Sequence, residues 1–266
     1  MPLSLQTFPT ADAAGAALAA DGASRYLGGG TLVVRDANEG DISFSTYVRV
    51  TDPALGAITV GGGRATLGAS VTMGQIIADS RLDCLRKAAH SVGGPAIRNM
   101  ASVGGNLYAP APYSDLGVAL LALDARIQIA DATIPLADFL SGRDTVYSRS
   151  VLKSVSFDIP TSGTLRFIKA SRVRPKGVSI VTIAAHLTEA DGRIASARVA
   201  YGCMSDRPMR AAHVEAALIG QPRTAEGIAG ALTIAAEGTE PMSDAIASAW
   251  YRSQVLPVHL GRLLLA

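Results

Sequence analysis

The sequence predicts an α+β protein of two domains, on three observations. In the second half of the chain, strand-like runs come first and helix-like runs follow, which is the block pattern of α+β architecture. Proline and glycine stand close together within residues 159–163, as at a domain boundary. The length of 266 residues is more than one ordinary compact domain. We therefore expect one domain over residues 1–160 and a second over residues 161–266.

The first half contains short elements of both kinds in alternation. Residues 11–20 are rich in alanine and favour a helix, and residues 24–27 have strand composition and lead into a glycine cluster. Residues 116–123 are continuously apolar but too short to cross a membrane, which indicates a buried helix. The remaining elements predicted here are strands over 42–48, 57–60 and 125–130 and helices over 72–78 and 82–89.

The second half separates its strands from its helices. Three strand-like runs are divided by turns such as the Asp191-Gly192 pair, and three helix-like runs follow them. The predicted strands cover 164–171, 180–187 and 193–201, and the predicted helices cover 209–218, 225–236 and 243–264. This order predicts a small antiparallel sheet backed by helices.

Composition excludes several classes of protein. With 48% hydrophobic and 17% charged residues, the chain can bury a core and is not disordered. A net charge of +2 without a basic tract does not suit a nucleic-acid binder. The two cysteines, Cys84 and Cys203, are too few for a disulfide framework, a zinc site or a four-thiolate iron–sulfur cluster.

The apolar segments and the N-terminal residues indicate where the protein resides. No apolar run reaches the length of a membrane span. The first twenty residues carry Asp12 and no Lys or Arg before Arg25, unlike the charged start of a signal peptide. We expect a cytoplasmic protein.

Glycine is the most informative residue type. The 27 glycines gather in clusters at residues 28–30, 61–63, 93–94 and 104–105. Glycine is needed where φ is positive or where a ligand approaches the backbone closely. Tight turns between short strands would require the same residues, so both interpretations stay open for any single cluster.

Two of these clusters have the pattern of a phosphate site. Gly28, Gly29 and Gly30 follow a predicted strand, and their bare N–H groups together with the Thr31 hydroxyl would form a nest for an anion such as pyrophosphate. In the second segment, Ser102 and Asn106 flank Gly104 and Gly105, and Asp115 follows nine residues after Asn106. A branched side chain at Gly104 is expected to intrude where a phosphate chain lies close to the backbone. From spacing alone, a dinucleotide site and ordinary turns both remain possible.

Side-chain chemistry is otherwise sparse. The four histidines are isolated, and there is no Gly-x-Ser-x-Gly elbow, Walker A or Rossmann glycine motif. Cys84 stands near Arg81, Arg86 and Lys87, which could lower the pKa of its thiol, although a lone helical cysteine more often packs in a core. We expect no catalytic side chain and no metal ligand set in this chain.

Several segments of the chain, by their residues and their order, resemble the FAD-binding medium subunit of the molybdenum hydroxylases. This family includes xanthine dehydrogenase and carbon monoxide dehydrogenase. The resemblance extends through almost the whole chain, and the ordered set is more specific than any one segment. The segments that carry it are 28–31, 101–107, Ala111-Pro112 with Asp115, 120–125, 167–172, 201–202, 208–210, Glu215, 218–220, Asp244, 251–252 and Arg262.

The resemblance implies a set of residues that bind the cofactor. The first segment would wrap the FAD pyrophosphate and the second would hold it from the other side, with Asp115 on the ribityl or phosphate region. Tyr108 would lie over the flavin ring, and Lys169 would meet the flavin or its phosphates from the second domain. The implied FAD-binding residues are Gly28, Gly29, Gly30, Thr31, Leu32, Ala101, Ser102, Val103, Gly104, Gly105, Asn106, Tyr108, Asp115 and Lys169.

Three positions depart from the family pattern. Leu32 stands where the family usually has Asp, Asn or Ser, so one side-chain hydrogen bond to the cofactor is missing. Ala111 stands where the family has serine before proline. Residues 173–177 are unusual in a loop that shields the flavin in some relatives.

The resemblance also implies a fold, an activity and partners. The fold would be a two-lobed FAD-binding domain of the vanillyl-alcohol-oxidase (PCMH) type, followed by a small antiparallel sheet with a helical bundle. The chain would be the FAD-carrying electron-transfer subunit, a flavoprotein, of a heterotrimeric molybdenum hydroxylase. A large subunit would carry the molybdenum pterin cofactor and a small subunit the 2Fe-2S clusters that supply electrons to FAD for an external acceptor. The heterotrimer would form a dimer.

Two other functions remain to be weighed. A free-standing flavin oxidoreductase of the same superfamily would need its own substrate acid, and the sequence offers no compelling one. A scaffold subunit with a decayed FAD site has Leu32 as its only indication. The absorbance spectrum of the purified chain distinguishes the scaffold, and iron and molybdenum that purify with it distinguish the complex.

Overall fold

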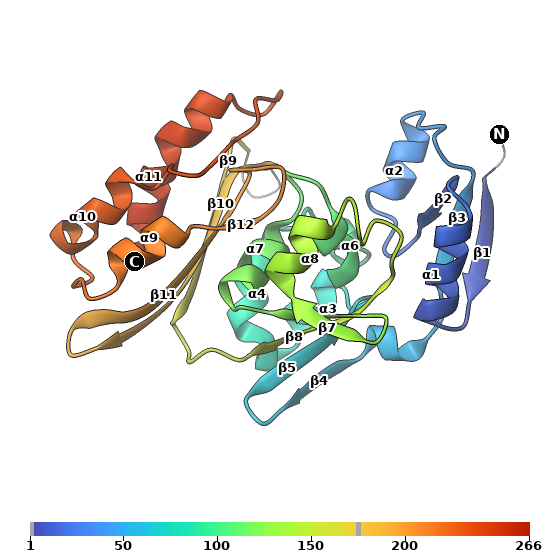
Figure 1. Cartoon of the computed structure of the whole chain (residues 1–266), viewed down its shortest axis with the longest axis horizontal. Coiled ribbons are helices and arrows are strands. Elements are labelled where there is room, and N and C mark those ends of the chain that lie inside the picture. The colour runs from blue at the N-terminus through green and yellow to red at the C-terminus, as the bar shows by residue number, and fades with distance from the viewer. Residues whose placement is uncertain (1–2, 174–176) are drawn as a thin grey trace.

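The computed structural model describes residues 3–173 and 177–266 and consists of three bodies in a row (Figure 1). We call them the N-terminal lobe (residues 4–50), the central body (53–158) and the C-terminal body (165–266). The first lies at one end of the molecule and the last at the other, with the central body between them. This is the α+β fold that the sequence predicted, with two lobes before an antiparallel sheet and its helices.

The N-terminal lobe is a small parallel sheet with helices. Its strands follow the order β1-β3-β2, and α1 is capped by Thr10, whose hydroxyl accepts the N–H of Ala13. The strand predicted over 42–48 is wrong in its first half, because the Asp41 carboxylate accepts the N–H of Ser43 and turns the chain there. The elements are β1 (Ser4–Phe8), α1 (Ala11–Ala20), β2 (Ser24–Tyr26), α2 (Val33–Asn38) and β3 (Thr46–Val50).

The central body wraps helices against a five-stranded antiparallel sheet of order β4-β5-β8-β6-β7. The helix predicted over 116–123 is α7, and all its residues are buried. The elements are η1 (Pro53–Gly56), β4 (Ile58–Gly61), β5 (Arg64–Gly68), α3 (Met73–Ala78), η2 (Ser80–Leu82), α4 (Asp83–Ser91), α5 (Pro95–Arg98), α6 (Val103–Tyr108), α7 (Asp115–Ala122), β6 (Arg126–Ile129), β7 (Ala132–Pro135), α8 (Leu136–Gly142) and β8 (Leu152–Asp158).

The C-terminal body is a four-stranded antiparallel sheet of order β12-β11-β10-β9 with three helices on it. Two predicted helices begin too early. Met209–Arg210 pairs with β11 as a strand, and Asp244 accepts the N–H groups of Ile246 and Ala247 in a turn before α11. The elements are β9 (Leu165–Ser171), β10 (Ser179–Ala190), β11 (Arg193–Gly202), β12 (Met209–Arg210), α9 (Ala212–Leu218), α10 (Ala225–Thr233) and α11 (Ala249–Leu265).

The central and C-terminal bodies are joined by a buried helix. α7 packs on β10 and β11, so the apolar helix of one body is covered by the sheet of the other. Burial of that apolar surface stabilises the contact. The two bodies are therefore held in a fixed relation at the N-terminus of α7, where Asp115 lies. Among the helices of the described residues, none is both long and apolar enough to cross a bilayer.

Candidate functional site

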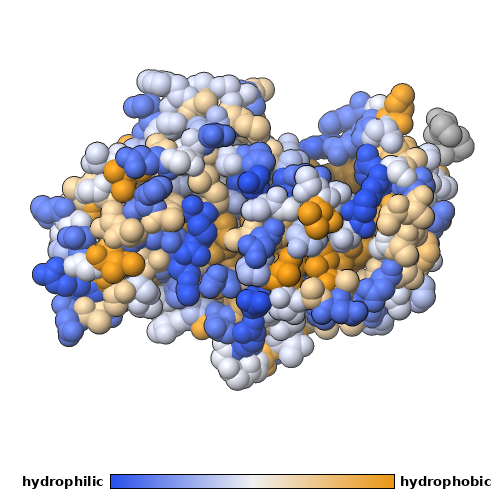
Figure 2. Space-filling model, in the orientation of Figure 1, coloured by the Kyte–Doolittle hydropathy of each residue, from blue (hydrophilic) through white to orange (hydrophobic). Residues whose placement is uncertain are grey.

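A cavity of about 790 Å³ lies where the three bodies meet. Its wall includes residues 28–32 of the N-terminal lobe, residues 101–102 and 104–106 of the central body, and Lys169 of the C-terminal body. Ligand sites in proteins usually measure about 300–1,000 Å³. In the space-filling view, the outline dips between the N-terminal lobe and the rest of the molecule (Figure 2). The cavity is large enough for a dinucleotide.

The first glycine segment presents unused hydrogen-bond donors to this cavity. Leu27 is the last residue before it that pairs in the sheet, donating its N–H to Val48. The backbone N–H groups of residues 28–32 donate to no other described residue. Partly buried N–H groups are normally paired with protein, water or ligand. A run of residues with unused N–H donors on a cavity wall is the kind of backbone that binds anions such as pyrophosphate.

The two glycine segments also contact each other. A side chain at Gly29 would lie 1.7 Å from the Met100 carbonyl oxygen, and one at Gly28 would lie 3.2 Å from Ser102 Oγ. Gly30 has φ +74°, which other residues seldom adopt. Glycine is therefore required here for the packing of the segments on each other, in addition to access for a ligand.

The second glycine segment is the beginning of a helix and not an open loop. Ser102 caps α6 by accepting the N–H of Gly105, and the N–H of Gly104 donates to Ala69. These N–H groups are already engaged, so the Ser102 hydroxyl proton is the main donor left to face a ligand. A side chain at Gly104 would meet Ala69, at 3.1 Å from its Cβ and its carbonyl oxygen. The expectation that it would intrude on a phosphate is wrong, because the helix packs on β5 at that point.

The other predicted residues of this segment differ in where they point. Ala101 lies on the cavity wall, whereas the Val103 side chain is fully buried in the hydrophobic core and does not line the cavity. Asn106 lies on the wall, but its amide donates to the Tyr113 carbonyl and accepts the N–H of Gly117. The side chain of Asn106 thus holds the segment before α7 in place.

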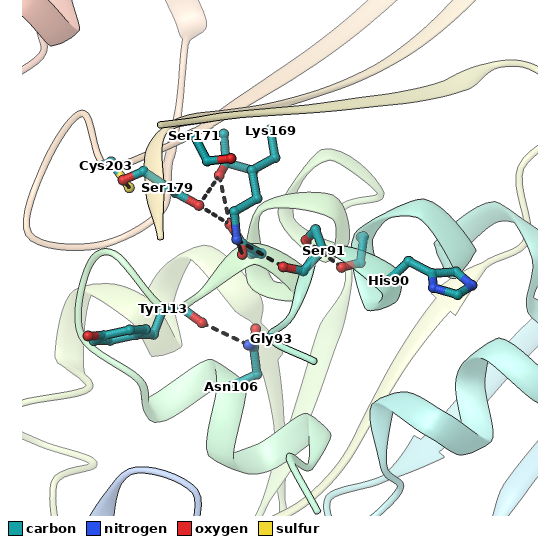
Figure 3. Close-up of polar contacts among 12 residues, drawn as sticks. His90, Ser91, Gly93, Asn106, Tyr113, Lys169, Ser171, Ser179 and Cys203 are labelled. Atoms are coloured by element: carbon teal, nitrogen blue, oxygen red, sulfur yellow. Dashed lines mark hydrogen bonds and ion pairs between the residues drawn. The ribbon is translucent and has the colours of Figure 1, made fainter. Parts of the chain in front are cut away.

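Asp115 and Lys169 form a buried ion pair across the boundary between the central and C-terminal bodies. Lys169 Nζ lies 2.7 Å from Asp115 Oδ2 and 2.9 Å from the Ser91 carbonyl oxygen. Asp115 Oδ1 accepts hydrogen bonds from Ser179 and Thr182. In Figure 3, the Lys169 ammonium reaches from β9 to the end of α4 at Ser91, with Ser179 beside it.

This pair keeps one donor for the cavity. An ammonium carries three N–H donors, and two of them are used by Asp115 and Ser91. Both residues line the cavity. Asp115 is also the first residue of α7, and the Lys169 ammonium lies against the last residue of α4, Ser91. At these two helix ends the dipoles favour a negative and a positive charge, respectively.

Tyr108 lies on the cavity wall with its hydroxyl turned to the protein. It donates to the carbonyls of Ser150 and Tyr147, at 2.7 and 3.0 Å, and its ring packs edge-on against Phe139. Burial raises the pKa of Tyr108 and that of Tyr26, which lies on the same wall. Both phenols therefore stay protonated near neutral pH and cannot serve there as bases.

Leu32 precedes α2 at the cap position. Its side chain accepts no hydrogen bond, whereas Asp, Asn or Ser at such a position usually binds an N–H of the first turn. Leu32 and Thr31 both line the cavity. The absent cap leaves the donors at this end of the segment unpaired.

Several cationic and aromatic residues on the wall were missed by sequence reasoning. Arg25, in the strand that leads into the first glycine cluster, lies over Phe44. Its place shortly before that cluster is the sequence signal that could have identified it. Arg143 and Arg149 reach the wall from a segment with no motif. The missed cationic and aromatic residues are Arg25, Tyr26, Arg35, Phe44, Tyr113, Arg143 and Arg149, and other missed lining residues include Ser148, Ser150 and Val178.

Two further expectations concern the shielding loop and metal ligands. Within the unusual 173–177 segment, residues 174–176 lie outside the described residues. Over 3–173 and 177–266, no three His, Cys, Asp or Glu side chains lie together as metal ligands would.

Of the two interpretations of Cys84, the structure supports packing against the core and contradicts a lowered pKa. Burial raises the pKa of its thiol to about 11, and Arg81 and Arg86 pair with Asp79 and Asp83 instead of with the thiol. Burial, together with the charge of Asp115, raises the pKa of Cys203 to about 12.

We therefore expect both thiols to be inert in the folded chain. At pH 8, alkylation by iodoacetamide should be roughly a hundredfold slower than in urea, because the thiolate is the nucleophile and free cysteine has a pKa of about 8.5. Mass spectrometry of timed samples measures both rates. Rapid labelling of Cys84 in the folded chain would contradict the prediction.

Family models of known proteins match both halves of the chain. A family model described as the FAD binding domain in molybdopterin dehydrogenase matches residues 6–161. A second, the CO dehydrogenase flavoprotein C-terminal domain, matches residues 166–266.

Individual relatives and solved structures agree with these matches. The xanthine dehydrogenase FAD-binding subunit of Escherichia coli O157:H7 is 28% identical, over 89% of this chain and 84% of that one. The glyceraldehyde dehydrogenase medium chain of Sulfolobus acidocaldarius is 26% identical, over 68% and 66%. Quinoline 2-oxidoreductase from Pseudomonas putida 86 superposes with a TM-score of 0.88 at 25% identity, over 100% and 96%. Carbon monoxide dehydrogenase from Hydrogenophaga pseudoflava, at 19% identity and a TM-score of 0.90 over 99% and 96%, shows the same fold.

Proposed function

The chain belongs to the family of FAD-binding subunits of the molybdenum hydroxylases, and on that premise we propose that it holds one FAD in the cavity between its three bodies and relays electrons. The single observation that carries the cofactor site is the run of five backbone N–H groups at residues 28–32 that have no partner among the described residues. FAD supplies the redox chemistry, and the protein supplies binding, orientation and electrostatics.

In this proposal each wall of the cavity has its own task. The N–H groups of residues 28–32 and the Ser102 hydroxyl bind the pyrophosphate, with Gly104 and Gly105 shaping the opposite side. Tyr108 faces the ring system with its own hydroxyl bonded to Ser150 and Tyr147. The free N–H of Lys169 donates to the flavin end, and Asp115 holds Lys169 there.

We propose that electrons come from 2Fe-2S clusters of a small partner subunit and leave to an external acceptor. A large subunit with the molybdenum pterin cofactor would oxidise the substrate, in a heterotrimer that forms a dimer. Support comes from relatives named as FAD-binding subunits or medium chains. The residues 3–173 and 177–266 also lack a metal ligand cluster of their own. We place the complex in the cytoplasm.

We also propose that residues 1–160 form the FAD-binding domain and residues 161–266 the second domain. The supporting observation is the connection between β8 and β9, which leads from the five-stranded sheet to the four-stranded one. The two family models meet in the same connection.

The test is a titration of the purified chain with FAD and with FMN, followed by absorbance and calorimetry. We expect one FAD per chain, bound at least about a hundredfold more tightly than FMN, since FMN lacks the pyrophosphate and each tenfold is about 1.4 kcal/mol. Equal affinity for the two flavins would reject the pyrophosphate site. A chain that binds neither would be a scaffold, and iron and molybdenum that purify with the FAD-loaded chain from its host would support the heterotrimer.

Replacing Asp115 with alanine is expected to weaken FAD binding about tenfold. The variant leaves Lys169 without its carboxylate partner, and hydrogen bonds to charged groups contribute about 1.5–3 kcal/mol. Calorimetric titration measures the dissociation constant, and Asp158→Ala, which removes an exposed carboxylate paired with Arg64, is the control. Full FAD occupancy with unaltered affinity in Asp115→Ala would place that carboxylate outside the site.

A further inference from the structure

Two hydroxyl side chains of β10 contact the Asp115 carboxylate from the C-terminal body. Ser179 Oγ and Thr182 Oγ1 each lie 2.7 Å from Asp115 Oδ1 and 3.0 Å from each other. Ser179 is 0% and Thr182 1% exposed. Neither residue belongs to a glycine segment, and neither lines the cavity. They reach the cavity through Asp115, which lines it.

An irregularity of the strand brings the two hydroxyls together. Residues three apart on a regular strand point to opposite faces of the sheet. The pairing of β10 with β9 shifts register between Ser179 and Val181. Such a bulge re-aims a side chain and is frequent beside active sites. Because of it, Ser179 and Thr182 both face the N-terminus of α7.

Ser179 is in turn fixed from its other side. Its carbonyl oxygen accepts hydrogen bonds from the Arg252 guanidinium of α11 and, at 3.6 Å, from the Cys203 thiol. Arg252 is almost fully buried and pairs with Asp244. The backbone of Ser179 is therefore held in place from this side, where Figure 3 shows Cys203 beside it.

Because of these contacts, the two oxygens of the Asp115 carboxylate have different hydrogen-bond partners. Oδ1 is occupied by the two hydroxyls, so Oδ2 is the oxygen that faces the Lys169 ammonium. With Oδ1 stabilised, Oδ2 draws less strongly on the ammonium, which then keeps more of its positive charge for the cavity that Lys169 lines. A cation held beside an electron acceptor favours the acceptor's more negative, reduced form.

We propose that Ser179 and Thr182 are positioning residues that set, through Asp115 and Lys169, how readily the FAD in the cavity is reduced. The inference rests on the proposed function. It adds that residues of the C-terminal body control the reduction equilibrium of the FAD bound at that site.

The experiment compares Thr182→Val, Thr182→Ser and Ser179→Ala in the full, FAD-loaded chain. Valine keeps the shape of threonine and removes the hydroxyl, and serine restores it. The control is Tyr201→Phe, which removes a buried hydroxyl of the same sheet that has no partner among the described residues. The ratio of reduced to oxidised FAD is measured at equilibrium with a redox dye of known potential. The FAD dissociation constant and the thermal unfolding of the FAD-free chain are measured beside it.

We expect Thr182→Val to lower the reduced-to-oxidised ratio about tenfold, as the loss of one charge-assisted hydrogen bond predicts. Ser179→Ala should lower it in the same direction, and Thr182→Ser should return it to within about twofold. Tyr201→Phe should leave it unchanged.

Three outcomes would overturn the inference. One is a wild-type ratio in Thr182→Val and Ser179→Ala while both bind FAD. Another is lower thermal stability with an unaltered ratio, which would make the hydroxyls structural only. The third is an equal change in Tyr201→Phe. A wild-type chain that takes up no FAD would instead reject the proposed function, and this inference with it.

Discussion

Replacing Gly29 with alanine is expected to abolish measurable FAD binding, with a loss of at least about a hundredfold in affinity. The added methyl would lie 1.7 Å from the Met100 carbonyl oxygen and 2.6 Å from its carbon. Since that neighbour is backbone, the two glycine segments must separate. Overpacking of this kind costs about 1–3 kcal/mol, and about 2.8 kcal/mol corresponds to a hundredfold. Displacement of the donor run at residues 28–32 adds to that loss.

Gly61→Ala provides the matched control for this variant. Gly61 lies in β4 and has no heavy atom within 4 Å of an added Cβ. It should bind FAD as the wild type does. Titration calorimetry of both variants, with circular dichroism to check folding, makes the comparison. Wild-type affinity in Gly29→Ala would mean that the contact between the segments does not shape the site.

The second large effect is expected at Arg252, which anchors α11 to the sheet. Its guanidinium is 1% exposed and donates to the carbonyls of Met242, Ser179 and Ile180 and to the Asp244 carboxylate. Asp244 is exposed, so the cost comes from the buried Ser179 and Ile180 carbonyls, which lose their donor at about 1–3 kcal/mol. Arg252→Met should lower the free energy of unfolding by that amount, measured by urea denaturation.

One control accompanies Arg252→Met. Arg262→Met, in the exposed face of the same helix, should change the free energy of unfolding by about 0.5 kcal/mol or less. A similarly small change in Arg252→Met would contradict the anchoring role.

The same pair predicts a pH dependence. Burial alone would raise the pKa of Asp244, but the N–H groups of Ala247 and Ile246 and the Arg252 charge hold it below its ordinary value. A lowered pKa in the folded state contributes stability above the ordinary pKa of about 3.9, which is lost as pH falls through the folded pKa. Stability should therefore fall below about pH 4 in the wild type, and less steeply in Arg252→Met.

The family and the fold were predictable from the sequence for a local reason. A phosphate nest needs consecutive residues without side chains, so Gly28, Gly29 and Gly30 are visible as a motif wherever the chain folds. The periodicity of apolar residues that distinguishes β9, β10 and β11 from the final helices is also a property of consecutive residues. The family membership and the α+β architecture that these patterns implied are confirmed.

The errors arose where one segment is decided by another. The strand at 42–48 was predicted too early because Asp41 turns the chain, and the pKa of Cys84 is set by its burial rather than by neighbours in sequence. Val103 belongs to an apparent ligand motif, yet its side chain lies in the core because α6 packs on β5. The binding assignments themselves, from Gly28 to Lys169, stay predictions.

By itself, the sequence determined to which family the chain belongs and predicted which backbone segment can approach an anion, since both depend on residues adjacent along the chain. Tertiary structure alone decided that Arg25, Arg143 and Arg149 share a wall with the glycine segments, and that Ser179 and Thr182 face one carboxylate. The physical reason is that burial and charge act through space. A strand bulge and the packing of α7 on β10 bring Ser179 and Thr182 into contact with Asp115, which lies 64 and 67 positions before them in the sequence.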